Sequence, residues 1–286
     1  MKKKTKFIAE IGSNHNRNLK RIYKLIKKAK ELEFYAVKFQ FFKIEKLYSK
    51  KAKKLYQKAL KKKKRELPAK FIPKISNYCK RKKIKFICTP FDIESINFLK
   101  KYVDYFKIAS YELNWKKLLL LCAKTKKPII ISTGMATSKE VKNSFNLIKK
   151  INKNISLLHC VSTYPAKASS CNLNSIQFLR KKFKCPVGWS DHTVNPLIIF
   201  NVVKYQKADY VEMHFDLDGK GWEEKEGNHH CWLPRNISEI FDFIKGEKTI
   251  NGKFAKKYSL EEKKERNYRA DPVDGLRPIR SYRKYL

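Results

Sequence analysis

The segment YFKIASYE, residues 105–112, sets the fold: it is a short apolar run that stops at a cluster of polar, chemically capable side chains. Seven other segments repeat this pattern: FIAE (7–10), AVKFQ (36–40), KFICTP (85–90), PIIISTGM (128–135), ISLLHCVSTY (155–164), PVGWSDH (186–192) and DYVEMHF (209–215). Helix-like stretches separate them. The repeat predicts an α/β protein, a (β/α)8 TIM barrel with its active site at the carboxyl ends of the strands. A doubly wound sheet would show the same alternation and stays the structural alternative.

Local signals between these runs agree with alternating strands and helices. Apolar residues at helical spacing predict a helix over residues 19–32. Residues 41–66 form a basic, partly helical insertion. Asp92 is placed to cap one helix, and Thr137 with Glu140 forms the T-x-x-E capping box of another.

The length of 286 residues suits one barrel domain. We predict the barrel over residues 1–248 and a short C-terminal tail over 249–286, too short for a second domain. No apolar stretch approaches the roughly 20 residues of a membrane span. The apolar run after the basic N-terminus is too short for a signal peptide. We therefore expect a cytoplasmic protein with no membrane partner.

The net charge of +41 is extreme and raises the question of nucleic acid binding. The lysines are spread over nearly every helix-like segment, opposite the apolar stripe, and no RNA-binding motif is visible. We interpret them as solvated helix faces and expect no nucleic acid partner, although the charge can attract an anionic substrate. The seven cysteines include no C-x-x-C pair, which favours neither a disulfide framework nor a zinc finger.

Two lysines lie inside apolar strand runs, Lys38 and Lys107. Lysine is rarely buried without a partner, so the pair indicates a phosphate or carboxylate site, with snorkelling surface lysines as the plainer interpretation. Carboxylates end or follow strands at Glu10 and Glu112 and can act as acids, bases or lysine partners. Hydroxyl groups at neighbouring strand ends suit phosphate recognition; they belong to Thr89, Ser110, Ser132 and Ser190.

Two histidines end neighbouring strands, His192 and His214, where two imidazoles can share one ion. An incomplete protein shell suits a catalytic divalent metal, although a lone histidine is more often structural. His230 follows the last strand and can reach the mouth of the barrel as a substrate-binding residue. His15 and His159 are weaker candidates, and His159 has the setting of a satisfied core residue.

The strand ends together resemble the sialic acid synthase family, whose members make nonulosonic acids such as N-acetylneuraminate, legionaminate and pseudaminate. The resemblance runs in order from residue 6 to 218, through FIAEIGSNHN (7–16), AVKFQ (36–40), CTPFD (88–92), KIASYE (107–112), ISTGM (131–135), HCVSTYP (159–165), GWSDHT (188–193) and VEMHFDLD (211–218). Each piece is weak by itself, and eight in order are specific.

The resemblance implies a transferase that condenses phosphoenolpyruvate with N-acetylmannosamine or a 2,4-diacetamido-trideoxyhexose and releases phosphate by C–O cleavage. It implies that His192 and His214 hold Mn2+ or Mg2+, which polarises the aldehyde. Catalytic positions of the family fall on Glu10, Lys38, Lys107, Glu112 and Tyr164. Substrate-binding positions fall on Gln40, Thr89, Ser110, Ser132, Ser162 and Ser190.

Three departures from the family pattern bear on these expectations. Members usually carry a C-terminal antifreeze-like domain that reaches into the partner's active site with an arginine. We expect this chain to lack it, so a tail arginine is a candidate substitute: Arg269, Arg277 or Arg280. Ser162 stands where neuraminate-forming members often have Asn, and residues 227–232 differ from the usual Asp-His loop. Because members of this family usually form homodimers, the resemblance implies a homodimer.

Two other functions remain open. The chain can be another phosphoenolpyruvate-using ketodeoxy-acid synthase or an aldolase; a covalent-lysine aldolase would form a borohydride-trappable adduct without metal. A non-catalytic, nucleic-acid-binding barrel would bind DNA or RNA with a steep salt dependence and would tolerate His192→Ala.

Overall fold

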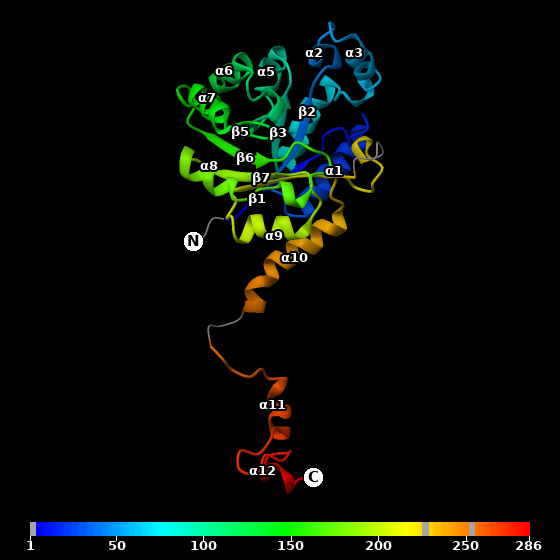
Figure 1. Cartoon of the computed structure of the whole chain (residues 1–286). Coiled ribbons are helices and arrows are strands. Elements are labelled where there is room, and N and C mark those ends of the chain that lie inside the picture. Colours follow the sequence, from blue (N-terminus) through cyan, green and yellow to red (C-terminus); the bar gives the residue numbers. More distant parts are fainter. Residues whose placement is uncertain (1–3, 225–228, 252–254) are drawn as a thin grey trace. The chain divides into compact units, whose positions relative to one another are not determined.

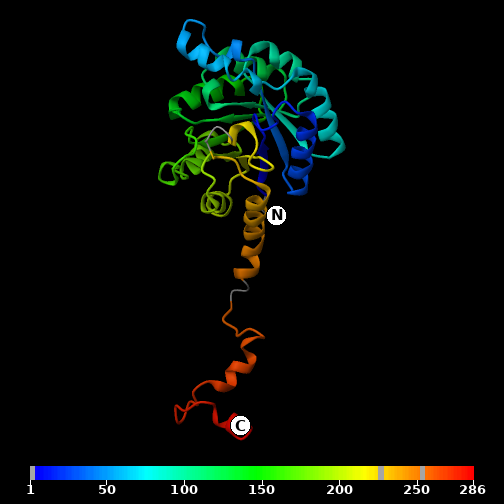
Figure 2. The ribbon, with the colours of Figure 1, turned by 90° about the vertical axis from the view of Figure 1, so that its right-hand side faces the viewer.

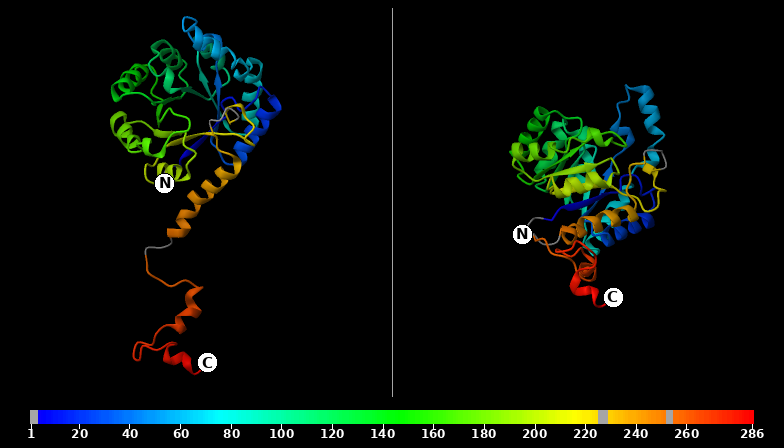
Figure 3. Two further views of the ribbon diagram at one scale, coloured as in Figure 1. Left: turned by 45° about the vertical axis from the view of Figure 1, so that its right-hand side comes forward. Right: turned by 60° about the horizontal axis from the view of Figure 1, so that its bottom comes forward.

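A computed structural model describes residues 4–224, 229–251 and 255–286. Eight parallel strands close into a barrel in the order β1 to β8, with helices outside the ring (Figures 1 and 3). The strands are β1 (Lys6–Glu10), β2 (Ala36–Phe41), β3 (Lys85–Pro90), β4 (Tyr105–Ile108), β5 (Ile129–Ser132), β6 (Ile155–Cys160), β7 (Val187–Asp191) and β8 (Tyr210–His214). Because β1 pairs with both β2 and β8, the predicted TIM barrel is confirmed and the doubly wound sheet is excluded.

The helices that cover the barrel are α1 (Leu19–Glu31), α4 (Ile72–Arg81), α5 (Ile93–Leu99), α6 (Lys116–Lys124), α7 (Ser138–Lys149), α8 (Ser175–Phe183), α9 (Pro196–Lys204) and α10 (Pro234–Asn251). Two of them, α5 and α7, begin where the capping signals predict. Asp92 accepts a hydrogen bond from the Ser95 amide (2.8 Å), and Thr137 and Glu140 form the complete capping box. The insertion after β2 contains α2 (Ile44–Leu47) and α3 (Lys53–Leu60) and projects from the barrel (Figure 2, light blue).

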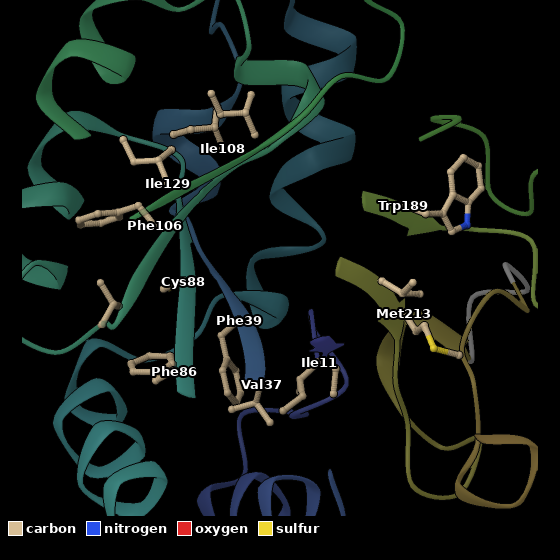
Figure 4. Packing of buried hydrophobic residues seen from close by; sticks show 14 of the residues in the cluster. Ile11, Val37, Phe39, Phe86, Cys88, Phe106, Ile108, Ile129, Trp189 and Met213 are labelled. Atoms are coloured by element: carbon tan, nitrogen blue, oxygen red, sulfur yellow. The ribbon is translucent and has the colours of Figure 1, made fainter. Parts of the chain in front are cut away.

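Most buried apolar side chains of the barrel fall into two separate clusters, and a third, small cluster lies in the insertion after β2. The larger of the two barrel clusters lies between strands and helices; there Phe39 of β2 packs edge-on against Phe86 of β3, with ring centroids 5.9 Å apart (Figure 4). The smaller of the two contains alternate strand residues: Ile8, Ala36, Ile87, Ile130, Leu158 and Tyr210. Because side chains alternate along a strand, this cluster fills the amino-terminal part of the barrel interior and leaves the carboxyl-terminal part to polar residues.

The chain divides into two compact units, Met1–Ile244 and Lys245–Leu286. The second contains α11 (Glu262–Glu265) and α12 (Arg280–Arg283), and ion pairs connect its turns, including Asp274 with Arg283 (2.5 Å). No hydrophobic side chain is buried among its described residues. In the part of the chain that the structure describes, no helix is long and apolar enough to span a membrane.

Candidate active site at the carboxyl ends of the strands

Strand alternation and register bring the predicted residues to one place. Lys38 and Gln40 share one face of β2, and Glu212 and His214 share one face of β8, because residues two apart point the same way. In the parallel pairing, Glu10 at the end of β1 stands opposite Lys38 on one side and His214 on the other. The inward-facing ends of β1, β2 and β8 therefore form one continuous polar surface.

The two strand lysines lie in a buried ion-pair network, so the snorkelling interpretation is wrong. Lys38 is 4% exposed and forms ion pairs with Glu10 and with Glu212 Oε1 (3.5 Å). Lys107 is 2% exposed; its ammonium lies 3.6 Å from Glu212 Oε1 and donates to Ser132 Oγ (2.7 Å). One buried carboxylate, Glu212, thus bridges both lysines.

The four charged groups in this network have different proton affinities. Burial opposes ionisation of Glu212, but Lys107 and Lys38 outweigh burial and hold its pKa at about 2. Burial raises the pKa of Glu10, with Lys38 opposing that effect. Burial also lowers the pKa of Lys107, and Glu212 only partly offsets this. Glu10 is therefore the carboxyl group of the network that most readily takes a proton.

The predicted hydroxyl groups lie around the lysines in two ways. Ser190 Oγ donates to Glu212 Oε1 (3.1 Å), which connects β7 to the network. Thr89 is 1% exposed, and no hydrogen-bond partner for its Oγ1 occurs among the described residues. A buried hydroxyl without a protein partner is uncommon and points to a ligand or water.

The turn after β5 brings backbone close to the ends of β4 and β6. The Gly134 amide donates to Ser110 Oγ (3.0 Å), which lies 3.2 Å from Cys160 Sγ. A methyl group on Gly134 would collide with Ser162 Oγ and crowd the other two side chains. Gly134 therefore leaves the space that two predicted substrate-binding serines, Ser110 and Ser162, occupy.

Glu112, in the short turn after β4, has a pKa close to neutrality. Its side chain is 9% exposed, and burial raises its pKa from 4.5 to about 7, although its own backbone N–H and Lys107 act in the opposite direction. Its Oε2 has no hydrogen-bond partner within the described ranges. A buried carboxyl group that is half ionised near pH 7 suits proton transfer.

A compact donor group lies at the end of β8. Potential ligand atoms of four buried residues, His214, Glu223, His230 and Cys231, all lie within 4.8 Å of one another. His214 Nδ1 is 2.9 Å from Glu223 Oε2, which is also 3.8 Å from His230 Nε2. Burial opposes ionisation of Glu223, but His214 outweighs it and holds the pKa at about 2.

The predicted metal ligands His192 and His214 are close together, with ring centroids 5.4 Å apart, but only His214 belongs to the compact donor group. His192 Nδ1 is 2.6 Å from the Val161 carbonyl oxygen. The Tyr164 ring packs against the His192 imidazole, with ring centroids 4.2 Å apart and the planes tilted by 39°. His192 thus borders the site beside Tyr164. His230, predicted to bind substrate, also lies within the donor group. Residues 225–228 of the preceding loop are outside the described residues.

The loop after β1 holds Glu223 in place. The Ser13 amide donates to Glu223 Oε1 (2.8 Å), and the Glu223 amide donates to Asn14 Oδ1 (3.0 Å). Gly12 has φ +49°, and a side chain there would collide with the Glu223 carboxylate. Two loops that are distant in sequence are thereby fixed against each other.

Four residues of the site have no role that the sequence predicts: Glu212, Glu223, Cys231 and Asn14. Glu212 had a usable signal, since it stands two residues before His214 on the same strand face. Glu223 had none, because its contact with His214 depends on a long loop returning to the barrel. His159 is the satisfied residue that was expected, with its Nε2 2.8 Å from the Cys171 carbonyl oxygen.

The comparisons with known proteins agree on a family. The NeuB family model matches residues 25–256. The chain belongs to the NeuB family. It is 40% identical to the N,N'-diacetyllegionaminic acid synthase of Campylobacter jejuni over 76% of this chain and 69% of that protein. It is 35% identical to a pseudaminic acid synthase of the same species over 76% of this chain and 66% of that protein.

A solved structure supports the same conclusion. The N-acetylneuraminic acid synthetase of Leptospira borgpetersenii, crystallised with citrate, superimposes with a TM-score of 0.78 at 28% identity, covering 92% of this chain and 90% of that one. The resemblance to sialic acid synthases is therefore confirmed. This NeuB-family chain is an enzyme of the transferase class. The alternative of a non-catalytic barrel is therefore wrong.

Proposed function

We propose that this NeuB-family enzyme condenses phosphoenolpyruvate with an N-acylated amino-hexose, giving a nine-carbon keto acid and phosphate. The observation that carries the proposal is the pair of lysines, 4% and 2% exposed, at the polar end of the barrel. Burying two ammonium groups costs free energy unless groups of opposite charge pair with them. Phosphoenolpyruvate is a compact polyanion that can form such pairs. The synthases to which the chain is similar are named for legionaminic, pseudaminic and neuraminic acid.

The phosphoenolpyruvate site is proposed on the β2–β5 side. Lys107 and Ser132 already share a hydrogen bond, and the unsatisfied Thr89 hydroxyl adds a donor that an anion can use. Entry of the anion would replace the carboxylates as partners of Lys38 and Lys107. Glu10 can then become neutral, because burial already raises its pKa.

A divalent metal is proposed at the end of β8. The chemistry of the donors fits one, since imidazole nitrogens and an ionised carboxylate within 4.8 Å of one another are common ligands of divalent ions. When bound, the ion would polarise the carbonyl of the open-chain sugar. Glu10, opposite His214 in the register, lies between the lysines and this group.

Side chains of the barrel can supply and remove the protons that the condensation needs. C3 of phosphoenolpyruvate bonds to the aldehyde carbon, whose oxygen gains a proton, and a water molecule adds at C2 after losing one. The C2–O bond to phosphate then breaks, the new C2 hydroxyl loses its proton to the departing phosphate, and C2 becomes a ketone. Glu112 is proposed as the base for the water, because Lys107 influences its pKa and so associates it with the phosphoenolpyruvate side.

The acceptor sugar is proposed on the β6–β8 side. Tyr164 is 39% exposed, and the centroid of its ring lies 4.2 Å from that of His192 and 5.1 Å from that of His230. Ser162, after β6, is half-buried and offers a hydroxyl group to the sugar. Gln40, at the end of β2 and on the same strand face as Lys38, is also half-buried and is proposed to contact the sugar from across the barrel. Both N-acetylmannosamine and the 2,4-diacetamido-trideoxyhexoses are candidate acceptors.

The test is an assay of phosphate release in which each component is omitted in turn. We expect release only when phosphoenolpyruvate, a divalent metal and an N-acetylated hexose are all present. Lys107→Met should abolish it, whereas the exposed Lys116→Met should not. Phosphate release without any sugar, or full activity after EDTA, would count against the proposal. A borohydride-trappable adduct on lysine would favour the aldolase alternative.

A further inference from the structure

The insertion after β2 concentrates positive charge in one short stretch, the basic segment (residues 50–65). Ten of its sixteen residues are Lys or Arg and none is Asp or Glu, whereas Lys and Arg make up 67 of the 286 residues of the whole chain. Lys53, Lys54 and Lys58 of α3, and Lys61 after it, are exposed. Charges of one sign gathered in one place create a local field that evenly spread charges do not.

The fold places this charge beside the mouth of the barrel. The insertion leaves the carboxyl end of β2 and projects from the barrel (Figure 2, light blue). Its small apolar core packs against Phe91, which follows β3. At the other end, Arg65 Nη2 donates to the carbonyl oxygen of Trp222 (3.3 Å), the residue before Glu223. The basic segment is thus fixed on two sides next to the proposed active site.

The lysines inside the barrel do not supply a comparable long-range attraction. Lys38 and Lys107 lie 3.5 and 3.6 Å from Glu212 Oε1, and Lys38 also pairs with Glu10. Glu212 is ionised, because the two lysines hold its pKa at about 2. Since opposite charges a few ångströms apart largely cancel at a distance, this buried network attracts an approaching anion only at short range. The basic segment has no carboxylate of its own to cancel its charge.

We propose that the basic segment attracts phosphoenolpyruvate to the mouth of the barrel, and so strengthens binding of this anion but not of the uncharged sugar. The inference rests on the proposed function, because it takes phosphoenolpyruvate as the anion. Phosphoenolpyruvate carries negative charge on its phosphate and its carboxylate, and a field of one sign at the mouth of a site raises the local concentration of such a substrate by about tenfold or more. The lysines of the segment act through this field and contact no reacting atom.

The test compares two variants of the full chain that lose the same charge at opposite ends of the barrel. The first carries four substitutions in the basic segment: Lys53→Gln, Lys54→Gln, Lys58→Gln and Lys61→Gln. The matched control carries four at exposed lysines near the carboxyl ends of α5 to α8: Lys100→Gln, Lys124→Gln, Lys150→Gln and Lys181→Gln. Because these helices run antiparallel to the strands, the control lysines lie at the amino-terminal end of the barrel.

Calorimetry measures the Kd of phosphoenolpyruvate without any sugar. At about 0.01 M salt, where the Debye length is about 30 Å, the Kd should rise about tenfold in the first variant and less than about twofold in the control. At about 1 M salt the difference should vanish, because the screening length is then about 3 Å. Replacing the same four insertion lysines by Arg keeps the charge and should keep the wild-type Kd. If the first variant does not fold, Lys53→Gln with Lys54→Gln should still raise the Kd about threefold.

The outcomes separate this inference from the proposed function. Equal changes of Kd in the two fourfold Lys→Gln variants, or no change in either, would overturn the inference and leave the proposed function standing. An equal rise of the KM for the uncharged sugar in the first variant would show a structural effect and would also overturn the inference. Failure of the wild-type chain to bind phosphoenolpyruvate at any salt concentration would reject the proposed function, and the inference with it.

Discussion

Glu112 shows how burial alone can prepare a side chain for chemistry. Its carboxyl group has a pKa of about 7 because the barrel end desolvates it, and the opposing charge of Lys107 does not restore the ordinary value. The network carboxylate Glu212, which is even more buried, keeps a pKa of about 2 because two lysines contact it. Two carboxyl groups at one site with separated pKa values are the usual sign of different roles.

The pH profile of kcat tests the role of Glu112. As a base it must be ionised, so activity should rise through pH 7 and level off above it. Glu112→Gln should lower kcat by about 100-fold or more and remove this limb from the profile. A variant that keeps the limb would show that another group titrates there.

Glu112 should also affect stability, with a defined sign. Because folding raises its pKa from 4.5 to about 7, the folded chain binds this proton more tightly than the unfolded chain. Its contribution is therefore fully favourable at low pH and is lost as pH rises toward 7, by up to about 3 kcal/mol. Glu112→Gln should raise the free energy of unfolding at pH 8 and change it little at pH 5, as measured by urea titration. A larger effect at pH 5 would contradict this assignment.

At the scale of elements, the turn between β5 and α7 aligns the serines. Gly134→Ala would drive a methyl group into Ser162 Oγ, which lies on the proposed sugar side, so the KM for the amino sugar should increase by about tenfold or more while the fold is kept. Gly246→Ala, where an added methyl group meets nothing within 4 Å, is the control and should leave KM unchanged. An unchanged KM in Gly134→Ala would show that this turn does not contribute to substrate binding.

The capping box of α7 tests how local signals stabilise the barrel. Thr137 accepts from the Glu140 amide, and Glu140 accepts from the Thr137 amide (2.7 Å). Thr137→Ala should cost about 1 kcal/mol in the free energy of unfolding. Thr137→Ser keeps the acceptor and should cost much less; equal losses in the two variants would show that the cap contributes little.

The elements that the sequence predicted best are those with a local cause. Capping residues and the helix over 19–32 were predicted within a residue or two, because hydrogen bonds and apolar spacing act over one helical turn. Lys38 and Lys107 were predicted because a charge inside an apolar run has few explanations. Glu223 was missed because its place depends on hydrogen bonds to residues 13 and 14, which are adjacent only in the fold.

At the scale of the whole molecule, apolar burial is confined to the first unit. Among the described residues of 245–286, only Asp271 is buried. Deleting residues 255–286 should therefore leave the thermal unfolding midpoint of the barrel within a few degrees of the full chain, since apolar burial supplies most of the stability. Circular dichroism would measure it, and a large drop would show that these residues stabilise the barrel.

The same deletion addresses the expected tail arginine. Where the barrel stays folded, a loss of activity would support a role for the tail in covering the sugar. Arg277→Ala is the informative single change, because Arg280 and Arg283 already contact Asp271 and Asp274. Arg277→Ala with full activity would exclude that residue as the substitute.

We propose that the carboxyl end of the barrel joins phosphoenolpyruvate to an amino sugar with cleavage of the C–O bond. Phosphoenolpyruvate labelled with 18O at the bridging C2 oxygen tests it most directly, with mass spectrometry of both products. We predict that the label leaves with phosphate and that the other product has the mass of the sugar plus the three-carbon unit. Label retained in the keto acid, or labelled phosphate with no nine-carbon product, would contradict this mechanism.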